Sequence, residues 1–441
     1  MKQRLPFCAA LFTAAAFVAT GCSSGGGSSP SPAQSPPPPP PPAGSLQVLP
    51  ATFDFGKVTA GNTPTPLEVT IANTSTGTAQ VSVSSISLLQ PTGSPFALIV
   101  NGGSRPCGSA SPTLPAASSC TVQVAFQPLS DATFSSTLQV NSNASNGTVF
   151  TLPITGTREM VTAWTLRINQ IDVATCPDTS ATAYVSVIDQ GGFPVTNLVT
   201  PNFTVTQGTP IFGFTVSLAA TTSPVAIAAA LDHSASLTQQ PVAFADMKAG
   251  FSTFFGSLRA GDEGAVINFD LAVELVQDWT PNQTLLQSVI AAPWDKGPNT
   301  RLYDAANLSV TETAKKTAFR RAAIIATDGV DDGSSVPLDT AIGNAQTAKV
   351  PLFMVGVGSS INRTVLTRMA VETGGLFFEA STSQNLATIY QQLSSILYGN
   401  QYVVKFNRLP AATTGSLPQI TIGASLPPLG ATDIRPITLC P

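Results

Sequence analysis

In the stretch "AIAAALDHSAS", polar side chains follow an apolar run at alternate positions. These are Asp232, Ser234 and Ser236, each separated from the next by one residue. Thr300 in "GPNTRLYDA" and Asp328 in "ATDGVDDGS" lie in two further polar clusters. Carboxylate and hydroxyl oxygens are the ligands that hard cations prefer. The five side chains therefore suit Mg²⁺, with Ca²⁺ or Mn²⁺ as poorer alternatives.

Aspartate, histidine and serine within three residues also raise the question of a hydrolase. His233 is the only histidine in the chain, and a Ser/His/Asp enzyme would need it as the general base. No G-x-S-x-G turn surrounds either serine, and no H-E-x-x-H zinc-protease motif is present. The pattern disfavours catalysis, so we assign no catalytic residue. We expect His233 to be a loop residue on the rim of the metal site, and Asp331 and Asp332 to form a solvated loop.

The elements around these clusters alternate between apolar strands and amphipathic helices. "VAIAAAL", "GAVINF", "AAIIAT" and "PLFMVGVG" are continuous apolar runs, which is typical of parallel strands covered on both faces. Two helices are predicted from apolar residues at helical spacing: Phe244, Met247, Phe251, Phe254, Phe255 and Leu258, then Leu386, Ile389, Tyr390, Leu393, Ile396 and Leu397. We predict a doubly wound, Rossmann-like α/β domain over residues 223–400. Such folds place polar sites at the carboxyl ends of their strands.

The same segment resembles a von Willebrand factor type A (VWA) domain, and its polar clusters resemble the metal-ion-dependent adhesion site (MIDAS) of that family. The resemblance implies that Ser234 and Ser236 bind the cation directly and that Thr300 does so directly or through water. It implies that Asp232 and Asp328 act largely through water and that a carboxylate of a bound partner completes the coordination. The chain departs from the family pattern where alanine separates the two serines and "GPNT" replaces "GGT". Neither departure removes an oxygen ligand.

Residues 46–159 show short alternating strands separated by turn residues, which predicts a β-sandwich. "ATFDFGKVTAGN", "LPAASSCTVQVAFQP" and "TLPITGT" resemble the Ig-like domains called choice-of-anchor D or ASH-type. That resemblance implies a disulfide between Cys107 and Cys120 and a role as a spacer or docking module.

A second β-pattern runs over residues 162–222 and returns only in residues 401–441. We interpret it as one β-domain that is split by the inserted α/β domain. Cys176 lies in the first part and Cys440 in the second, so a disulfide between them would join the two parts. No cysteines are spaced as C-x-x-C, which argues against a zinc or redox motif.

The first 45 residues have the composition of an export signal followed by a linker. A basic start and an apolar run over residues 1–21 precede Cys22 in "ATGC", which resembles the lipobox of bacterial lipoproteins. The resemblance implies lipidation of Cys22, the alternative being an ordinary secretory signal. Residues 22–45 are rich in Gly, Ser and Pro and predict a stalk. We expect a lipid anchor and an outer-membrane or cell-surface location.

Composition excludes some classes of function. Only 10% of the residues are charged and the net charge is −4, which argues against nucleic acid as a partner. The expected function is Mg²⁺-dependent adhesion or protein binding, with a ligand that presents a carboxylate. The alternatives are a structural or assembly factor of an envelope complex and, less favoured, an unrecognised hydrolase.

Overall fold

The computed structural model describes residues 44–441, except 60–62, 65, 92, 220–222, 239–240, 295–296, 359, 381–383, 412, 414 and 416. The expected signal peptide (1–21), Cys22 and nearly all of the expected linker (22–45) lie outside the described residues. None of the helices that the structure describes combines the length and the apolar character needed to cross a bilayer.

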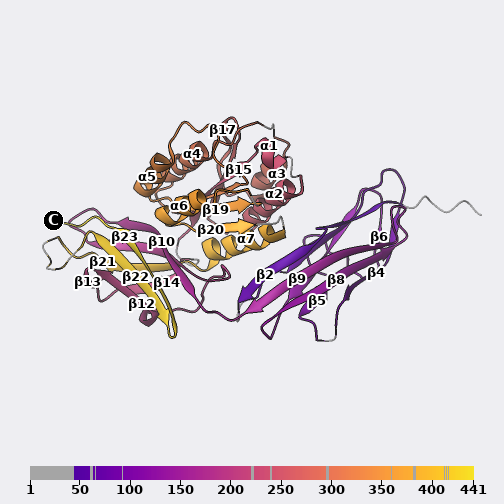
Figure 1. Ribbon diagram of the computed structural model, residues 1–441, viewed down its shortest axis with the longest axis horizontal. Coiled ribbons are helices and arrows are strands. Elements are labelled where there is room, and N and C mark those ends of the chain that lie inside the picture. Colours follow the sequence, from indigo (N-terminus) through magenta and orange to yellow (C-terminus); the bar gives the residue numbers. More distant parts are fainter. Residues whose placement is uncertain are drawn as a thin grey trace, which may run out of the picture. The chain divides into compact units, whose positions relative to one another are not determined.

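The first folded segment consists of two sheets with a common hydrophobic core (Figure 1). One sheet has the order β1-β3-β7-β5 and the other β2-β9-β8-β4-β6. Strands such as β3 alternate buried and half-buried side chains, because one face packs on the core and the other faces outward. The predicted disulfide between Cys107 and Cys120 is present. The strands are β1 (Leu46–Leu49), β2 (Phe53–Thr59), β3 (Leu67–Asn73), β4 (Val81–Leu89), β5 (Phe96–Ile99), β6 (Thr113–Leu114), β7 (Ser119–Phe126), β8 (Ala132–Ser142) and β9 (Val149–Glu159).

A second pair of sheets draws its strands from two separate parts of the sequence. One sheet has the order β10-β11-β21-β14 and the other β13-β12-β22-β23. The late strand β21 pairs with both β11 and β14, so it lies between two strands that precede it by more than 180 residues. The strands are β10 (Trp164–Val173), β11 (Ser180–Asp189), β12 (Phe203–Gln207), β13 (Thr209–Pro210), β14 (Thr215–Leu218), β21 (Tyr402–Asn407), β22 (Gln419–Leu426) and β23 (Leu429–Pro436), with a 3-10 turn at Thr200–Asn202.

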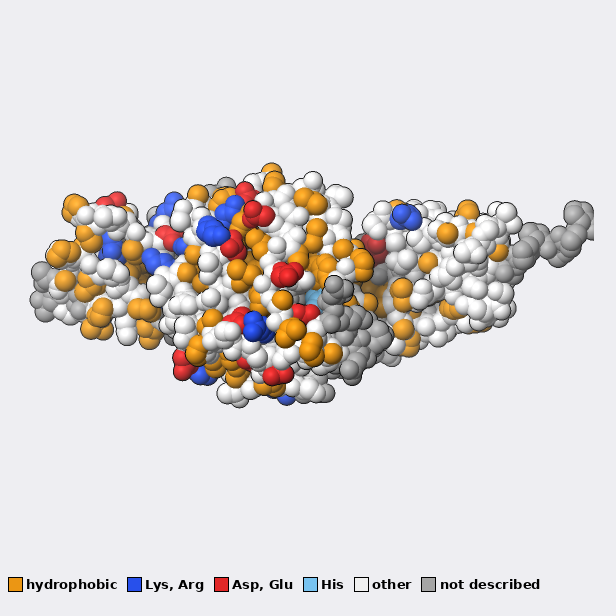
Figure 2. All heavy atoms as spheres, turned by 90° about the horizontal axis from the view of Figure 1, so that it is seen from above, with side chains coloured by type: hydrophobic (Ala, Val, Ile, Leu, Met, Phe, Trp, Pro, Cys, Tyr) orange, Lys and Arg blue, Asp and Glu red, His pale blue; other side chains and the backbone are white. Residues whose placement is uncertain are grey.

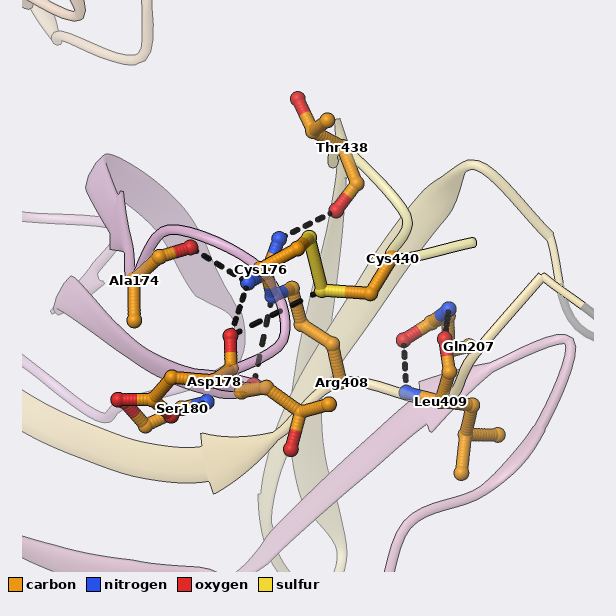
Figure 3. Close-up of a disulfide and its surroundings, with 10 residues drawn as sticks. Ala174, Cys176, Asp178, Ser180, Gln207, Arg408, Leu409, Thr438 and Cys440 are labelled. Atoms are coloured by element: carbon orange, nitrogen blue, oxygen red, sulfur yellow. Dashed lines mark hydrogen bonds between the residues drawn. A yellow bond between two sulfur atoms is a disulfide. The ribbon is translucent and has the colours of Figure 1, made fainter.

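A disulfide and a buried arginine join the two parts of this β-region (Figure 3). Cys176 is bonded to Cys440, as predicted. Beside the bridge, the Arg408 guanidinium donates to the carbonyl oxygens of Ala174, Asp178 and Thr438 at 2.7, 2.8 and 2.7 Å. Arg408 is 2% exposed. Carbonyl acceptors from both sides of the disulfide thus satisfy one buried cation, which fixes the end of the chain to the turn after β10.

In the sequence, an α/β region lies between the two parts of this β-region. It is built on a six-stranded sheet of order β17-β16-β15-β18-β19-β20. All neighbouring strands are parallel except the β16–β17 pair, and helices cover both faces of the sheet (Figure 1). The strands are β15 (Val225–Asp232), β16 (Glu263–Phe269), β17 (Val273–Thr280), β18 (Arg320–Thr327), β19 (Leu352–Val357) and β20 (Phe377–Ala380). The helices are α1 (Ala235–Thr238), α2 (Pro241–Phe255), α3 (Gln283–Ala291), α4 (Leu302–Ala314), α5 (Leu338–Ala348), α6 (Arg363–Thr373) and α7 (Gln384–Ser394), which continues as a π-helical turn (Ser395–Gly399).

The central strand β15 is buried at every position because both faces of the sheet are covered. Ile227 and Leu231 point into one apolar core with residues of α2, α3 and α7. Ala228 and Ala230 point into the other core, with residues of α4, α5 and α6. All four predicted strands and both predicted helices of this region are present.

Several helices begin or end at residues that stabilise helix termini. The Asn282 side chain accepts a hydrogen bond from the Leu285 amide at 3.0 Å and caps α3. Asn362 caps α6 in the same way through the Val365 amide at 3.2 Å. Gly374 follows α6 with φ of 92°, a left-handed conformation that favours glycine and ends the helix.

Candidate metal-binding site

The predicted site lies at the carboxyl ends of two adjacent strands. Strands β15 and β18 pair in parallel, with Leu231 opposite Ala326, so the residues that follow both strands meet at one edge of the sheet. The helix after β15 packs on one face of the sheet, and the helix after β18 packs on the other. The two connections therefore diverge here, at a topological switch point, where open α/β sheets form their binding crevices.

Asp232 is the last residue of β15 and forms the floor of the site. Its side chain is 0% exposed, and it accepts hydrogen bonds from the Ser234 amide at 2.8 Å and the Thr327 hydroxyl at 2.5 Å. Burial raises the pKa of Asp232 to about 6, and the nearby charge of Asp328 acts in the same direction. Thr327 is a member of the site that the pattern did not predict. The sequence signal that could have identified Thr327 is a hydroxyl residue at the end of an apolar strand, directly before Asp328.

The two serines carry the hydrogen-bond chain from the floor of the site to solvent. Ser234 is 1% exposed, whereas Ser236 is exposed at the start of α1. Their hydroxyl oxygens are 3.0 Å apart, and the Ser236 hydroxyl donates to Oδ1 of Asp328 at 3.0 Å. Burial also raises the pKa of Asp328, which is 4% exposed. Ser234, Ser236 and Asp328 thus form one connected cluster of oxygen atoms.

Thr300 reaches the same edge from the segment that precedes α4. Its backbone pairs with Asp332: the Thr300 amide donates to the Asp332 carbonyl at 3.2 Å, and the Asp332 amide donates back at 2.8 Å. A methyl group at Gly329 would lie 3.3 Å from the Thr300 hydroxyl oxygen. The hydroxyl therefore packs against the residue that follows Asp328, where a glycine leaves room for it.

The donor chemistry fits a hard divalent cation. Two carboxylates and several hydroxyls gather at one edge, and the donors that the structure gives Asp232 are neutral amide and hydroxyl groups. A cation would supply the positive charge that a buried carboxylate needs. Within the described residues there is no cluster of three or more His, Cys, Asp or Glu side chains that could hold a metal. A cation bound here would therefore depend on serine and threonine hydroxyls.

The structure corrects the expected place of His233. Its side chain is 1% exposed, and its ring packs against those of Trp294 and Phe244 at centroid distances of 4.1 and 4.9 Å. The reason lies in the strand alternation. The His233 amide still donates to the Phe269 carbonyl at 2.8 Å, so the side chain continues on the same side as Leu231, under α2. His233 belongs to the wall of the domain rather than to the rim.

Asp331 is not part of a purely solvated loop either. It is half-buried, and its Oδ1 accepts hydrogen bonds from the Tyr303 amide at 3.1 Å and the Ser334 hydroxyl at 2.5 Å. Tyr303 lies in the first turn of α4, whose amides lack partners within the helix. Asp332 is exposed, but its backbone pairs with Thr300. The loop after β18 is therefore bound to the start of α4.

This arrangement agrees with the comparison to known families. Residues 226–392 match the family model described as von Willebrand factor type A domain. These residues form a VWA domain. They lie inside the segment 223–400 that the strand and helix pattern delimits. No curated protein matches the sequence significantly.

Solved structures similar to this chain also contain VWA domains. A von Willebrand factor type A protein from Catenulispora acidiphila is 11% identical, with a TM-score of 0.38, and the match covers 63% of this chain and 73% of that one. The vWF domain of the type V pili tip protein Mfa5 from Porphyromonas gingivalis is 14% identical, with a TM-score of 0.34 and coverage of 39% and 94%. Proximal thread matrix protein 1 from the mussel byssus, solved with a zinc-occupied MIDAS motif, is 16% identical, with a TM-score of 0.35. This match covers 40% of this chain and 48% of the mussel protein, about half its length.

On one face of the molecule the charged side chains are mixed in sign. On the face that Figure 2 shows, Lys and Arg side chains are interspersed with Asp and Glu side chains, and neither sign forms a continuous patch. VWA domains generally bind proteins, and a mixed surface of this kind is compatible with such a partner.

Proposed function

We propose that this protein binds another protein or a matrix component through a divalent cation, Mg²⁺ foremost, held by its VWA domain. The ligands proposed are the five side chains at the ends of β15 and β18 and before α4: Asp232, Ser234, Ser236, Thr300 and Asp328. The observation that carries the proposal is the hydrogen-bond chain from buried Asp232 through Ser234 to exposed Ser236 and on to Asp328. It gathers hard oxygen donors where one side of the cluster is open to solvent.

The burial of each side chain supports a division of roles. Asp232 is fully buried and engaged by Thr327 and the Ser234 amide, so it acts from beneath the serines. Ser236 is exposed, so its hydroxyl lies on the side from which a partner approaches. When bound, the cation supplies positive charge and an open coordination position for a carboxylate of the partner. The chain's own residues place the oxygen donors around the cation, with Asp232 buried beneath them.

We propose a binding role rather than catalysis. His233 packs between Phe244 and Trp294 under α2, an environment of a wall residue rather than of a general base. For the rest of the chain we propose that residues 46–159 are an Ig-like spacer and that residues 162–222 and 401–441 form one split β-domain. Cys22 would carry the lipid that anchors the protein to the outer membrane or cell surface.

Calorimetry on the purified full chain tests the metal site directly. We expect Mg²⁺ to bind the wild type, and Asp232→Ala and Asp328→Ala to abolish the binding while the fold survives. Asp339→Ala is the matched control, because this carboxylate is exposed on α5 and pairs with surface Arg368. A pull-down from whole envelopes with Mg²⁺ or with EDTA then tests partner binding. Equal Mg²⁺ affinity in the two site variants and the wild type would refute the assignment.

A further inference from the structure

Two loops of the VWA domain are bound to each other by reciprocal hydrogen bonds. One is the loop after β18, residues 328–337, and the other comprises residues 297–301 together with the first turn of α4. Besides the backbone pair between Thr300 and Asp332, side chains from each loop cap the backbone of the other. The side chains that make these capping contacts are not among the five proposed metal ligands.

The loop after β18 supplies the cap of α4. The residue at the N-cap position, Arg301, makes no side-chain capping bond. Instead, the hydroxyl oxygen of Ser334 accepts from the amides of Tyr303 at 3.0 Å and Asp304 at 3.2 Å. Asp331 accepts from the Tyr303 amide as well and from the Ser334 hydroxyl. The amides that a helix start leaves without partners are thus satisfied by a distant loop.

The start of α4 caps the other loop in return. The Asp304 carboxylate accepts from the Ser335 amide at 2.9 and 3.0 Å and from the Val336 amide at 2.8 Å. It also pairs with Arg301 at 3.6 Å, and its side chain is 13% exposed. Asp304 therefore fixes the segment that leads into α5. Neither loop can shift without breaking bonds in both directions.

We propose that Ser334 and Asp304 are positioning residues that hold the Thr300 hydroxyl at the metal site. This inference rests on the proposed function. Thr300 lies on an irregular segment whose position follows from the bonds on either side of it. On one side is its backbone pair with Asp332, and on the other is the capped start of α4. A ligand on such a segment must be held to within about half an ångström, and partners that orient metal ligands typically change affinity 10- to 100-fold when removed.

The first test removes the cap without touching the metal ligands. Ser334→Ala should weaken Mg²⁺ binding about 10-fold in calorimetry, whereas Ser334→Thr, which keeps a hydroxyl, should restore it. Thr340→Ala, on the exposed side of α5, is the control and should bind like the wild type. Asp304→Asn is the second variant for the case in which Ser334→Ala does not fold. It removes the charge but keeps an oxygen acceptor, and should weaken binding several-fold.

A double-mutant cycle separates positioning from general destabilisation. If Ser334 acts through Thr300, then adding Ser334→Ala to Thr300→Ala should weaken Mg²⁺ binding less than twofold further. A metal-free measurement adds an independent readout. In EDTA, hydrogen exchange of peptides that contain the Thr300 and Asp332 amides should be faster in Ser334→Ala than in the wild type.

The outcomes distinguish this inference from the proposed function. If Thr300→Ala weakens Mg²⁺ binding but Ser334→Ala does not, the positioning role is wrong while the metal site stands. A full additive loss in the double variant would also overturn it, because Ser334 would then act by another route. If neither Asp232→Ala nor Thr300→Ala changes Mg²⁺ binding, the metal site itself fails. In that case unchanged hydrogen exchange in Ser334→Ala would refute the connection between the loops as well.

Discussion

Replacing Asp232 by asparagine tests the electrostatics of the site without changing the size of the side chain. Asp232 is fully buried, and burial together with the charge of Asp328 raises its pKa from 3.8 to about 6. The amide oxygen of asparagine can still accept from the Ser234 amide, and its NH₂ group can donate to Thr327. The substitution therefore removes the charge and leaves most of the hydrogen bonding in place.

The magnitude follows from the pKa of Asp232. Because each pKa unit corresponds to about 1.4 kcal/mol, a carboxylate raised from 3.8 to about 6 destabilises the metal-free folded protein by about 3 kcal/mol when ionised. Between about pH 4 and pH 6 the folded state holds a proton that the unfolded state has released. The free energy of unfolding of the metal-free protein therefore rises as pH falls through about 6. Asp232 contributes about 1.4 kcal/mol of this gain between pH 7.5 and pH 5.

We expect Asp232→Asn to be more stable than the wild type in EDTA at pH 7.5, by up to about 3 kcal/mol. The advantage should shrink as pH falls and disappear below about pH 3, where Asp232 is protonated in both the folded and the unfolded state. The assay is urea unfolding followed by tryptophan fluorescence, to which Trp279 and Trp294 of the VWA domain contribute. Asp339→Asn, which changes an exposed carboxylate on α5, is the control and should not gain stability in EDTA at pH 7.5.

Two results would refute this reasoning. One is an Asp232→Asn variant that is less stable than the wild type in EDTA at pH 7.5. The other is a free energy of unfolding that changes equally between pH 7.5 and pH 5 in the wild type and in Asp232→Asn. Either would mean that the carboxylate is compensated within the metal-free protein. A cation would then not be needed to relieve it.

Three further predictions concern the metal, the C-terminal disulfide and the anchor. In the same urea assay, Mg²⁺ at about 100 times its Kd should stabilise the wild type by about 2.7 kcal/mol at pH 7.5. The stabilisation should be smaller at pH 5, because a proton then occupies Asp232. Asp328→Ala should show no stabilisation by Mg²⁺. Replacing Cys176 and Cys440 together by serine should lower the free energy of unfolding of the β-region by about 2–5 kcal/mol. Reductant should produce the same loss in the β-region of the wild type and no further loss there in the double variant, whose remaining disulfide, Cys107–Cys120, lies in residues 46–159. Cys22→Ser should abolish lipid labelling and move the protein from the membrane to the soluble fraction after cell fractionation; a variant that stays with the membrane would contradict the lipid anchor.

The buried strands of the VWA domain could be predicted because their physical signature is local. A parallel strand covered on both faces reads as a continuous apolar run, and β15 and β18 do so. The antiparallel edge strand β17 has no such run. Its side chains are half-buried or exposed, so the strand lacks the continuous apolar run that marks β15 and β18. Likewise, α4 begins without a capping residue of its own, because its cap comes from Ser334.

The candidate site was predictable in its donors but not in its supports. Asp232 and Asp328 stand out because each follows an apolar run, and both belong to one edge once the strands are adjacent. The predicted location of His233 was wrong because the side to which its side chain points depends on whether the chain keeps its strand pairing for one more residue. It does so through the Phe269 carbonyl. Contacts between distant loops, such as those of Asp304 with Ser335, have no counterpart in local spacing.

The residues that hold the proposed ligands in place explain how a site with few charged ligands could still bind a cation. The direct donors that we propose are mostly neutral hydroxyls, which bind a cation weakly unless they are already in place. Thr327 and the Ser234 amide fix the floor at Asp232, and the capped start of α4 fixes the approach of Thr300. The buried carboxylate adds a free-energy cost in the metal-free state that a bound cation removes. We therefore expect the affinity for a cation to depend as much on the rigidity of the loops and the burial of Asp232 as on the number of ligands. This is why we expect substitutions at Thr327 and Ser334, which are not among the five proposed ligands, to change cation binding.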